Sequence, residues 1–137
     1  MTVAWAFVAV GSNLGDRAAW HAFAEDRLAA LDGVTVIRAT APRDTAPLDG
    51  AAQPPYLNRM LLIETTRSPA ALLAACHAIE RDAGRDRSTR WCSRTLDLDL
   101  VRYDDLLCDT PSLVLPHPGL RDRIFWAREM ADLETDD

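Results

Sequence analysis

Residues 85–103 read RDRSTRWCSRTLDLDLVRY, and this stretch decides both the expected fold and the expected chemistry. In its second half, leucines alternate with polar residues, and a period of two is typical of a strand with one buried face. We therefore predict a strand over residues 95–103 whose leucines enter a core. Asp97 and Asp99 would leave the opposite face together, about 6 to 7 Å apart along the strand. The residues expected on that face are Thr95, Asp97, Asp99, Val101 and Tyr103.

The first half of the stretch is cationic, with Arg85, Arg87, Arg90 and Arg94. Two neighbouring carboxylates repel each other unless a positive charge lies between them. Mg²⁺ takes one or two carboxylates together with phosphate oxygens and water, which suits an oxygen-only pair better than zinc does. An arginine-rich loop that leads into two acids on one face therefore predicts a phosphoryl-transfer site. The alternative is a solvated strand face beside exposed arginines.

Composition limits the classes of protein that need to be considered. The chain has 137 residues, 48% hydrophobic and 26% charged, as expected of a single globular domain over residues 1–137. A net charge of −6 argues against nucleic acid as a partner. The 15 basic residues are all arginines, which excludes a Walker A loop and Schiff-base chemistry. Three cysteines without C-x-x-C spacing indicate free thiols in the cytoplasm. The apolar N-terminus is shorter than the ~20 residues that a membrane span needs.

Hydrophobic periodicity predicts the remaining elements. Strands are expected over residues 3–10, 34–41, 57–66 and 95–103, and helices over residues 17–31 and 68–83. This order predicts an α+β, ferredoxin-like βαββαβ domain, in which two helices back an antiparallel sheet. Residues 42–55 are expected to form a proline-rich loop, residues 104–118 turns, and residues 120–133 a C-terminal extension ending in a short helix.

Two smaller features of the first third of the chain also lead to predictions. His21 lies beside the apolar stripe of the first helix and is expected on the surface. The turn at residues 11–16 reads GSNLGD, and Ser12 or Asp16 can cap the helix that follows. Such a turn can hold a polar ligand through backbone N–H groups, or it can be a plain capped turn.

Several motifs together resemble the 6-hydroxymethyl-7,8-dihydropterin pyrophosphokinase family of folate synthesis. They are Gly84-Arg85-x-Arg87-x-x-Arg90-Trp91-x-x-Arg94-Thr95-Leu96-Asp97-Leu98-Asp99, Leu115-Pro116-His117-Pro118 and Arg123-x-Phe125. The resemblance continues through Tyr56-Leu57-Asn58, Thr45-Ala46-Pro47-Leu48 and Gly11-Ser12-Asn13-Leu14, so it covers nearly the whole chain. It implies pyrophosphate transfer from ATP to the hydroxymethyl group of the pterin, with release of AMP and with two Mg²⁺ ions as cofactors.

The resemblance also implies a role for each matching residue. Asp97 and Asp99 would hold the metal ions and, with Arg87 and Arg94, form the catalytic set. ATP would contact Glu80, Arg87, Trp91, Arg94, His117 and Arg123. The pterin would contact Thr45, Leu48, Tyr56, Asn58 and Phe125, with the two aromatic rings enclosing the flat heterocycle and the amide reading its edge.

Other roles remain open for single residues and for the chain. Tyr56 could simply begin a strand, Phe125 could belong to the core, and His117 could be a rigid turn residue between prolines. The family usually has Trp-Gly-Pro-Arg where this chain has Trp91-Cys92-Ser93-Arg94, and the segment after Phe125 is more charged than expected. A non-catalytic pterin- or nucleotide-binding homologue is therefore an alternative. An RNA-binding ferredoxin-like domain is a second one, against which the net charge and the lack of an RNP-type aromatic pattern argue.

Overall fold

The computed structural model of the chain describes residues 2–45, 55–84 and 96–134. The main sheet consists of β1 (Ala4–Ser12), β2 (Val34–Ala39), β4 (Tyr56–Thr65) and β5 (Asp97–Tyr103), in the spatial order β2-β4-β1-β5, with β3 (Arg43–Thr45) added to β4. All neighbouring strands are antiparallel. Helix α1 (Arg17–Ala29) follows β1 and helix α2 (Pro69–Asp82) follows β4, so the predicted α+β, ferredoxin-like βαββαβ order is confirmed.

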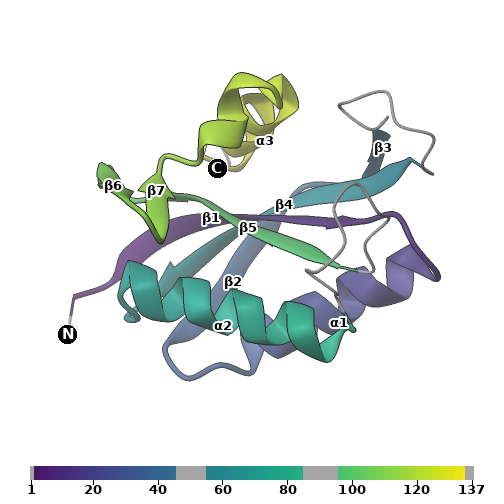
Figure 1. Cartoon of the computed structure of the whole chain (residues 1–137), viewed down its shortest axis with the longest axis horizontal. Helices are drawn as coiled ribbons and strands as arrows, with labels where there is room; N and C mark the ends of the chain where they lie inside the picture. The colour runs from purple at the N-terminus through teal and green to yellow at the C-terminus, as the bar shows by residue number, and fades with distance from the viewer. Residues whose placement is uncertain (1, 46–54, 85–95, 135–137) are drawn as a thin grey trace.

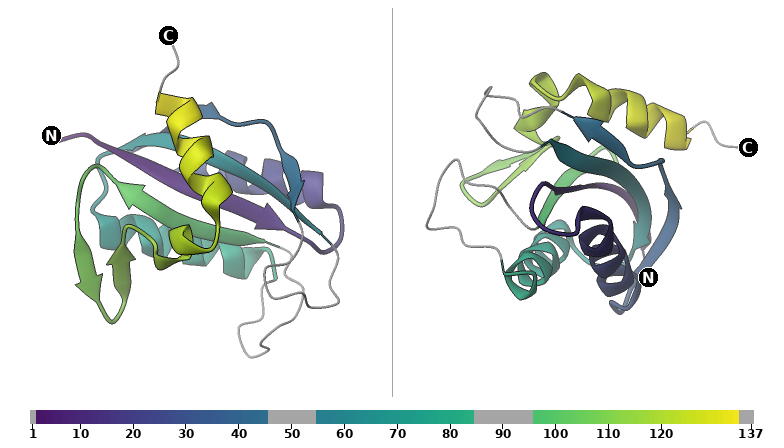
Figure 2. Two further views of the ribbon diagram at one scale, coloured as in Figure 1. Left: turned by 90° about the horizontal axis from the view of Figure 1, so that it is seen from above. Right: turned by 90° about the vertical axis from the view of Figure 1, so that its right-hand side faces the viewer.

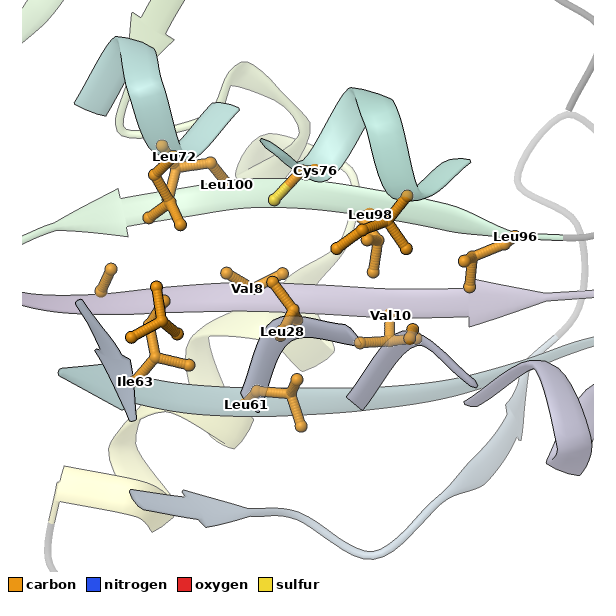
Figure 3. Packing of buried hydrophobic residues seen from close by; sticks show 14 of the residues in the cluster. Val8, Val10, Leu28, Leu61, Ile63, Leu72, Cys76, Leu96, Leu98 and Leu100 are labelled. Carbon is orange, nitrogen blue, oxygen red and sulfur yellow. The ribbon is translucent and has the colours of Figure 1, made fainter. Parts of the chain in front are cut away.

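The sheet separates two layers of helix. Helices α1 and α2 cover one face, and α3 (Ile124–Glu134) crosses the other (Figures 1 and 2). The larger core lies on the α1–α2 side, where Leu72 and Cys76 of α2 meet Leu98 and Leu100 of β5 (Figure 3). A smaller cluster lies under α3 and includes Phe7, Met60, Leu62, Trp126 and Met130. In the part of the chain that the structure describes, no helix is both long and apolar enough to cross a membrane.

Capping residues set the helix boundaries. The Asp16 carboxylate accepts a hydrogen bond from the Ala19 amide at 3.1 Å, and the Ser68 hydroxyl accepts one from the Ala71 amide at 3.2 Å. Helix α2 ends before Gly84, whose φ of 82° is a conformation that favours glycine. The helices predicted over residues 17–31 and 68–83 are therefore confirmed, and Asp16 rather than Ser12 caps the first.

Three segments contain more regular structure than the sequence predicted. The prediction of a loop without strands over residues 42–55 was wrong at β3, which pairs with the start of β4. Residues 104–118 include a hairpin of β6 (Cys108–Thr110) and β7 (Leu113–Leu115). The C-terminal segment forms a 3-10 turn, η1 (Pro118–Arg121), and then α3. Strands of three residues are too short to show a recognisable alternation in sequence.

Strand β5 follows the predicted alternation only as far as Val101. Up to that point the leucines lie in the α1–α2 core, and Asp97 and Asp99 lie on the opposite face, as predicted. The pairing with β1 then shifts by one residue, because Val101 is an extra residue in β5. Since a bulge exchanges the two faces of a strand, Tyr103 packs against the α1–α2 core. The prediction that Tyr103 shares a face with the aspartates was therefore wrong.

His21 is buried rather than exposed. Its side chain is 4% exposed, and Nε2 lies 2.7 Å from the carbonyl oxygen of Leu57 in β4. Because a carbonyl only accepts, Nε2 carries a proton and donates it. Burial lowers the pKa of His21 from its ordinary value of 6.5. The prediction of a surface histidine was wrong because a hydrogen bond to the sheet allows this polar ring to lie inside the helix–sheet contact.

Candidate active site

A pocket of about 400 Å³ lies along β5, which is an edge strand of the main sheet. Its walls come from α2, β5, the β6–β7 hairpin and the segment from η1 to α3. The residues that line it are Leu73, His77, Glu80, Asp97, Leu98, Asp99, Leu100, Pro111, Ser112, Leu113, Val114, His117, Pro118 and Arg123. Five residues predicted for ATP or metal binding thus share one pocket, although they come from α2, β5, the end of the hairpin and the turn before α3.

His117 and Asp99 face each other in this pocket. The Nδ1 atom of His117 accepts a hydrogen bond from the Gly119 amide at 2.8 Å, so Nε2 carries the proton of the neutral ring. His117 Nε2 lies 3.6 Å from Asp99 Oδ1, which is too far for a direct hydrogen bond. Both side chains are more than a quarter exposed, at 29% and 26%. A donor and an anionic acceptor therefore stand at the surface of the pocket, where a ligand can reach them.

Trp126 supports the cationic side of the pocket. Its indole is 3% exposed, contacts the His117 ring edge-to-face at 5.2 Å, and lies 5.0 Å from the Arg123 guanidinium. Both contacts use the electron-rich ring of a buried tryptophan to orient a polar neighbour. No role was predicted for Trp126 from the sequence. Its spacing of four and seven residues from the buried Met130 and Leu133 is the helical signal that could have identified it as an anchor.

Glu80 connects α2 to β5 at the aspartates. It is 1% exposed, and its Oε2 atom accepts a hydrogen bond from the Leu98 amide at 2.7 Å. Leu98 lies between Asp97 and Asp99, so this bond fixes the backbone that carries both of them. Hydrogen bonds to an ionised carboxylate are among the stronger ones in proteins.

Cys76 lies one helical turn before Glu80 and takes no part in the predicted chemistry. Burial raises the pKa of its thiol to about 12, and the negative charges of Glu80 and Asp99 add to the effect. A thiol with so high a pKa stays protonated, whereas nucleophiles and metal ligands need the thiolate. Cys76 and Cys108 are free cysteines, as predicted, and Cys92 lies outside the described residues.

The described residues predicted for pterin binding lie on the α3 side of the sheet. Thr45 of β3 pairs with Tyr56 of β4, and the Asn58 amide nitrogen donates a hydrogen bond to the Thr45 hydroxyl. A Cβ atom at Gly11 would lie 3.0 Å from Asn58 Oδ1, so the missing side chain leaves room for the Asn58 amide over β1. Phe125, at the start of α3, packs against the smaller core cluster on this face.

Four predicted site residues cannot be placed. Arg87, Trp91 and Arg94 belong to residues 85–95, and Leu48 belongs to residues 46–54, which lie outside the described parts of the chain. The elements on either side of residues 85–95 are α2 and β5, and both line the pocket. The hairpin wall at residues 111–114 was not predicted, because a turn-rich segment carries no periodic signal.

The donor set fits a magnesium ion that shares its ligands with phosphate. Among the described residues, no three His, Cys, Asp or Glu side chains are grouped closely enough to hold a metal ion by themselves. Structural zinc sites use four protein ligands, whereas Mg²⁺ takes one or two carboxylates and completes its shell with phosphate oxygens and water. Asp97 and Asp99 match the second pattern.

Comparison with known proteins covers the same elements. The sequence profile of the family described as 7,8-dihydro-6-hydroxymethylpterin-pyrophosphokinase (HPPK) matches residues 7–135. The chain is 37% identical to the 2-amino-4-hydroxy-6-hydroxymethyldihydropteridine pyrophosphokinase of Methylorubrum extorquens, over 96% of this chain and 83% of that protein. Proteins of the same name from Bacillus subtilis and Pseudomonas aeruginosa are 34% and 35% identical, over 93% and 95% of this chain and 77% and 80% of their own lengths. The profile match includes every element that lines the pocket.

Proposed function

Because the chain belongs to the 7,8-dihydro-6-hydroxymethylpterin-pyrophosphokinase family, we propose that it transfers pyrophosphate from ATP to 6-hydroxymethyl-7,8-dihydropterin in folate synthesis. The observation that carries this proposal is the pocket along β5, where Asp97 and Asp99 lie with His117 and Arg123. Carboxylates for a metal ion and cationic donors for phosphate are the two groups of residues that phosphoryl transfer requires.

Mg²⁺ at Asp97 and Asp99 is part of the proposal. Among the described residues that line the pocket, the acids Asp97, Asp99 and Glu80 outnumber the one arginine, Arg123. A triphosphate would be repelled by these carboxylates unless cations neutralised them. When bound, two Mg²⁺ ions would supply that neutralisation and polarise the transferred group. Arg87 and Arg94, assigned by the family resemblance, would add positive charge from the segment that joins α2 to β5.

The proposed step forms one P–O bond, breaks another and releases the hydroxyl proton. The hydroxymethyl oxygen bonds to the β-phosphorus of ATP as the bond from that phosphorus to the α,β-bridging oxygen breaks. AMP leaves with the bridging oxygen, the hydroxyl proton passes to solvent, and the pterin keeps the β- and γ-phosphates. Hydrogen bonds from His117 Nε2 and the Arg123 guanidinium to the phosphate oxygens would strengthen as charge develops in the transition state.

The pterin would bind on the α3 side of the sheet. Tyr56 and Phe125 supply aromatic faces, and the backbone near Thr45 and Leu48 supplies further hydrogen bonds. Since the Asn58 amide nitrogen already donates to Thr45, its carbonyl oxygen is the atom that can accept a hydrogen bond from the edge of the pterin. This division gives Asn58 one structural bond and one recognition bond.

We also propose that the protein acts in the cytoplasm and without a nucleic-acid partner. Cys76 and Cys108 are free thiols, as expected in a reducing compartment. The net charge of −6 is unfavourable for binding a phosphate backbone.

Product analysis tests the proposed reaction. With Mg²⁺, ATP and 6-hydroxymethyl-7,8-dihydropterin, we expect one AMP for each pterin consumed, and no AMP when the pterin is left out. Formation of ADP and inorganic phosphate would contradict the proposal. Tight binding of pterin and ATP without turnover would instead support a non-catalytic homologue.

A further inference from the structure

One side of α1 carries a row of polar residues whose partners lie on and just before β4. Figures 1 and 2 show α1 on the face of the sheet opposite α3. Arg17, His21 and Glu25 are spaced by four residues, so they lie on one side of the helix at intervals of about 6 Å. Alternate residues of a strand repeat at about 6.6 Å, so every fourth residue of a helix can contact every second residue of a neighbouring strand. We call this row, with its partners on and just before β4, the polar seam.

The polar seam consists of three successive contacts. Arg17 Nη1 donates to the Pro55 carbonyl oxygen at 3.0 Å, and His21 Nε2 donates to the Leu57 carbonyl oxygen at 2.7 Å. Arg59 Nη1 lies 2.9 Å from Glu25 Oε2. The last two contacts join α1 to the body of the sheet. The first joins it to the residue immediately before β4.

Arg17 makes an additional contact that the other two residues do not provide. Its Nη1 atom also lies 2.6 Å from Oδ1 of Asp44 in β3. One guanidinium therefore holds both β3 and the start of β4, which precede and follow residues 46–54 in the chain. Because β3 has only three residues, its ladder to β4 is short, and Arg17 provides a further contact between β3 and α1.

The opposite face of this two-stranded ribbon carries the proposed pterin residues. Asp44 is paired with Leu57, and both face α1, whereas Thr45 and Tyr56 are paired on the α3 side. Asp44 comes directly before Thr45, and Pro55 comes directly before Tyr56. Arg17 thus binds the residue preceding each member of that pair.

We propose that Arg17 is a positioning residue for the pterin site, an inference that rests on the proposed function. It does not touch the pterin. By bonding Asp44 and Pro55 together, it sets the separation of β3 from β4 and so the placement of Thr45 and Tyr56 on the other face. Both bonds leave the Nη1 atom, whose two hydrogens are held in the plane of the guanidinium and so point in fixed directions, whereas the ammonium group of a lysine rotates.

Stability alone is a weak explanation for these contacts. The Arg17 side chain is 32% exposed and that of Asp44 is 62% exposed. Ion pairs at this exposure contribute little to the free energy of unfolding. Loss of the contact should therefore change the geometry of the pterin site more than it changes the melting temperature.

Binding measurements on two variants of α1 test the proposal. Arg17→Met keeps the apolar stem and removes the donors, and Arg17→Lys keeps the charge. The matched control is Arg27→Met, also on α1, which breaks the exposed ion pair between Arg27 and Asp82 of α2. For each protein we would titrate 6-hydroxymethyl-7,8-dihydropterin and, separately, a non-hydrolysable ATP analogue with Mg²⁺, and would record the melting temperature.

We expect Arg17→Met to weaken pterin binding by about three- to tenfold and to change binding of the ATP analogue by less than about twofold. Arg17→Lys should recover part of the loss, and Arg27→Met should bind like the wild type. Asp44→Asn should weaken pterin binding too, and combining it with Arg17→Met should add less than the sum of the single effects, since both act on the Arg17–Asp44 contact.

Two outcomes would overturn the role of Arg17 and leave the proposed function standing. One is wild-type pterin affinity in Arg17→Met. The other is an equal loss of affinity for both ligands together with a lower melting temperature, which is the result for a residue that only supports the fold. Failure of the wild-type protein to bind the pterin would instead overturn the proposed function, and the role of Arg17 with it.

Discussion

His117 and His21 are both histidines beside charged residues, but their surroundings differ. In the polar seam, His21 Nε2 lies 2.7 Å from the Leu57 carbonyl oxygen, and the side chain is 4% exposed. In the β5 pocket, His117 Nε2 lies 3.6 Å from Asp99, and the side chain is 29% exposed. The polar seam closes its contacts within the protein. The pocket leaves a donor and an acceptor apart at an open surface.

This difference separates residues that hold the fold from residues that meet a ligand. Burying a polar group is costly unless it is hydrogen-bonded within the protein, and His21 meets this requirement through Nε2. Like charges such as Asp97 and Asp99 are placed close together at some cost in stability, and a bound cation offsets that cost. We therefore expect substitutions in the pocket to lower turnover with little effect on stability, and substitutions of His21 and Glu25 in the polar seam to do the reverse. Arg17 is the exception within the seam, because the residues that it bonds adjoin the proposed pterin site.

The largest effect is expected from Asp97→Asn and Asp99→Asn. Each variant removes one of the proposed anionic metal ligands while keeping size and strand geometry. Turnover at saturating Mg²⁺ should fall by ~10² to 10³, or about 3 to 4 kcal/mol in the activation free energy. The melting temperature should stay the same or rise, because repulsion between the two carboxylates is reduced.

Asp109→Asn provides the matched control, since Asp109 is an exposed residue of β6 that does not line the pocket. It should leave turnover and stability unchanged. Normal turnover in both pocket variants would mean that Asp97 and Asp99 are only a solvated strand face. Lost turnover together with a large drop in melting temperature would mean that they are structural.

A smaller effect, on stability alone, is expected from Glu25→Gln in the polar seam. Arg59 and Glu25 are 24% and 23% exposed, so their ion pair is partly shielded from water. Its loss should lower the free energy of unfolding by about 1 kcal/mol. For a domain of this size, that corresponds to a melting temperature about 3 to 5 °C lower. Turnover should not change.

The more exposed Arg102–Glu134 pair serves for comparison, and Glu134→Gln should cost less stability than Glu25→Gln. If Glu25→Gln lowered turnover as strongly as the pocket variants do, the division between seam and pocket would be incorrect.

The smallest effect is a pH dependence of stability from His21. Because its pKa in the folded protein is below the ordinary value of 6.5, the unfolded chain takes up the proton first as the pH falls. Stability should therefore decrease as the pH falls below about 6.5. The charged groups nearest the ring are Glu25, Arg59 and Arg17.

A His21→Gln variant isolates this contribution, since glutamine can donate to Leu57 but does not titrate. Burial raises the pKa of Glu129, which gives the opposite trend, but Glu129 is present in both proteins and its effect cancels. As the pH falls, the free energy of unfolding of the wild type should therefore decrease relative to that of His21→Gln. A difference that is constant with pH would show that His21 is not held neutral.

Sequence was sufficient wherever a pattern was long. The alternation before Val101 placed Asp97 and Asp99 on one face and the leucines in the core, and capping residues marked α1 and α2. Features of only a few residues, and a buried polar side chain that depends on a hydrogen bond to a distant residue, were not predictable. The bulge at Val101 is one added residue, β3 has three residues, and His21 is buried only because Leu57 accepts its hydrogen bond.

The candidate site divides in the same way. Chemical type and family resemblance led to Asp97, Asp99, His117 and Arg123, and the fold gathers them in one pocket. Trp126 lies close in sequence to its partners His117 and Arg123, and it went unnoticed although its spacing from Met130 and Leu133 is helical. Other supporting residues went unnoticed because their partners lie far away in sequence. Arg17, for example, bonds Asp44 and Pro55, and no local pattern in the chain connects these residues.

The central claim is that pyrophosphate moves intact from ATP to the pterin. Its most direct test follows labelled phosphate from ATP to the products. Two parallel reactions would contain Mg²⁺, the pterin and ATP labelled at either the α- or the γ-phosphorus. We predict that the γ-label appears in the pterin product and that the α-label appears only in AMP, with neither reaction forming ADP. Recovery of the γ-label as inorganic phosphate, or of a pterin product carrying the α-label, would contradict this account.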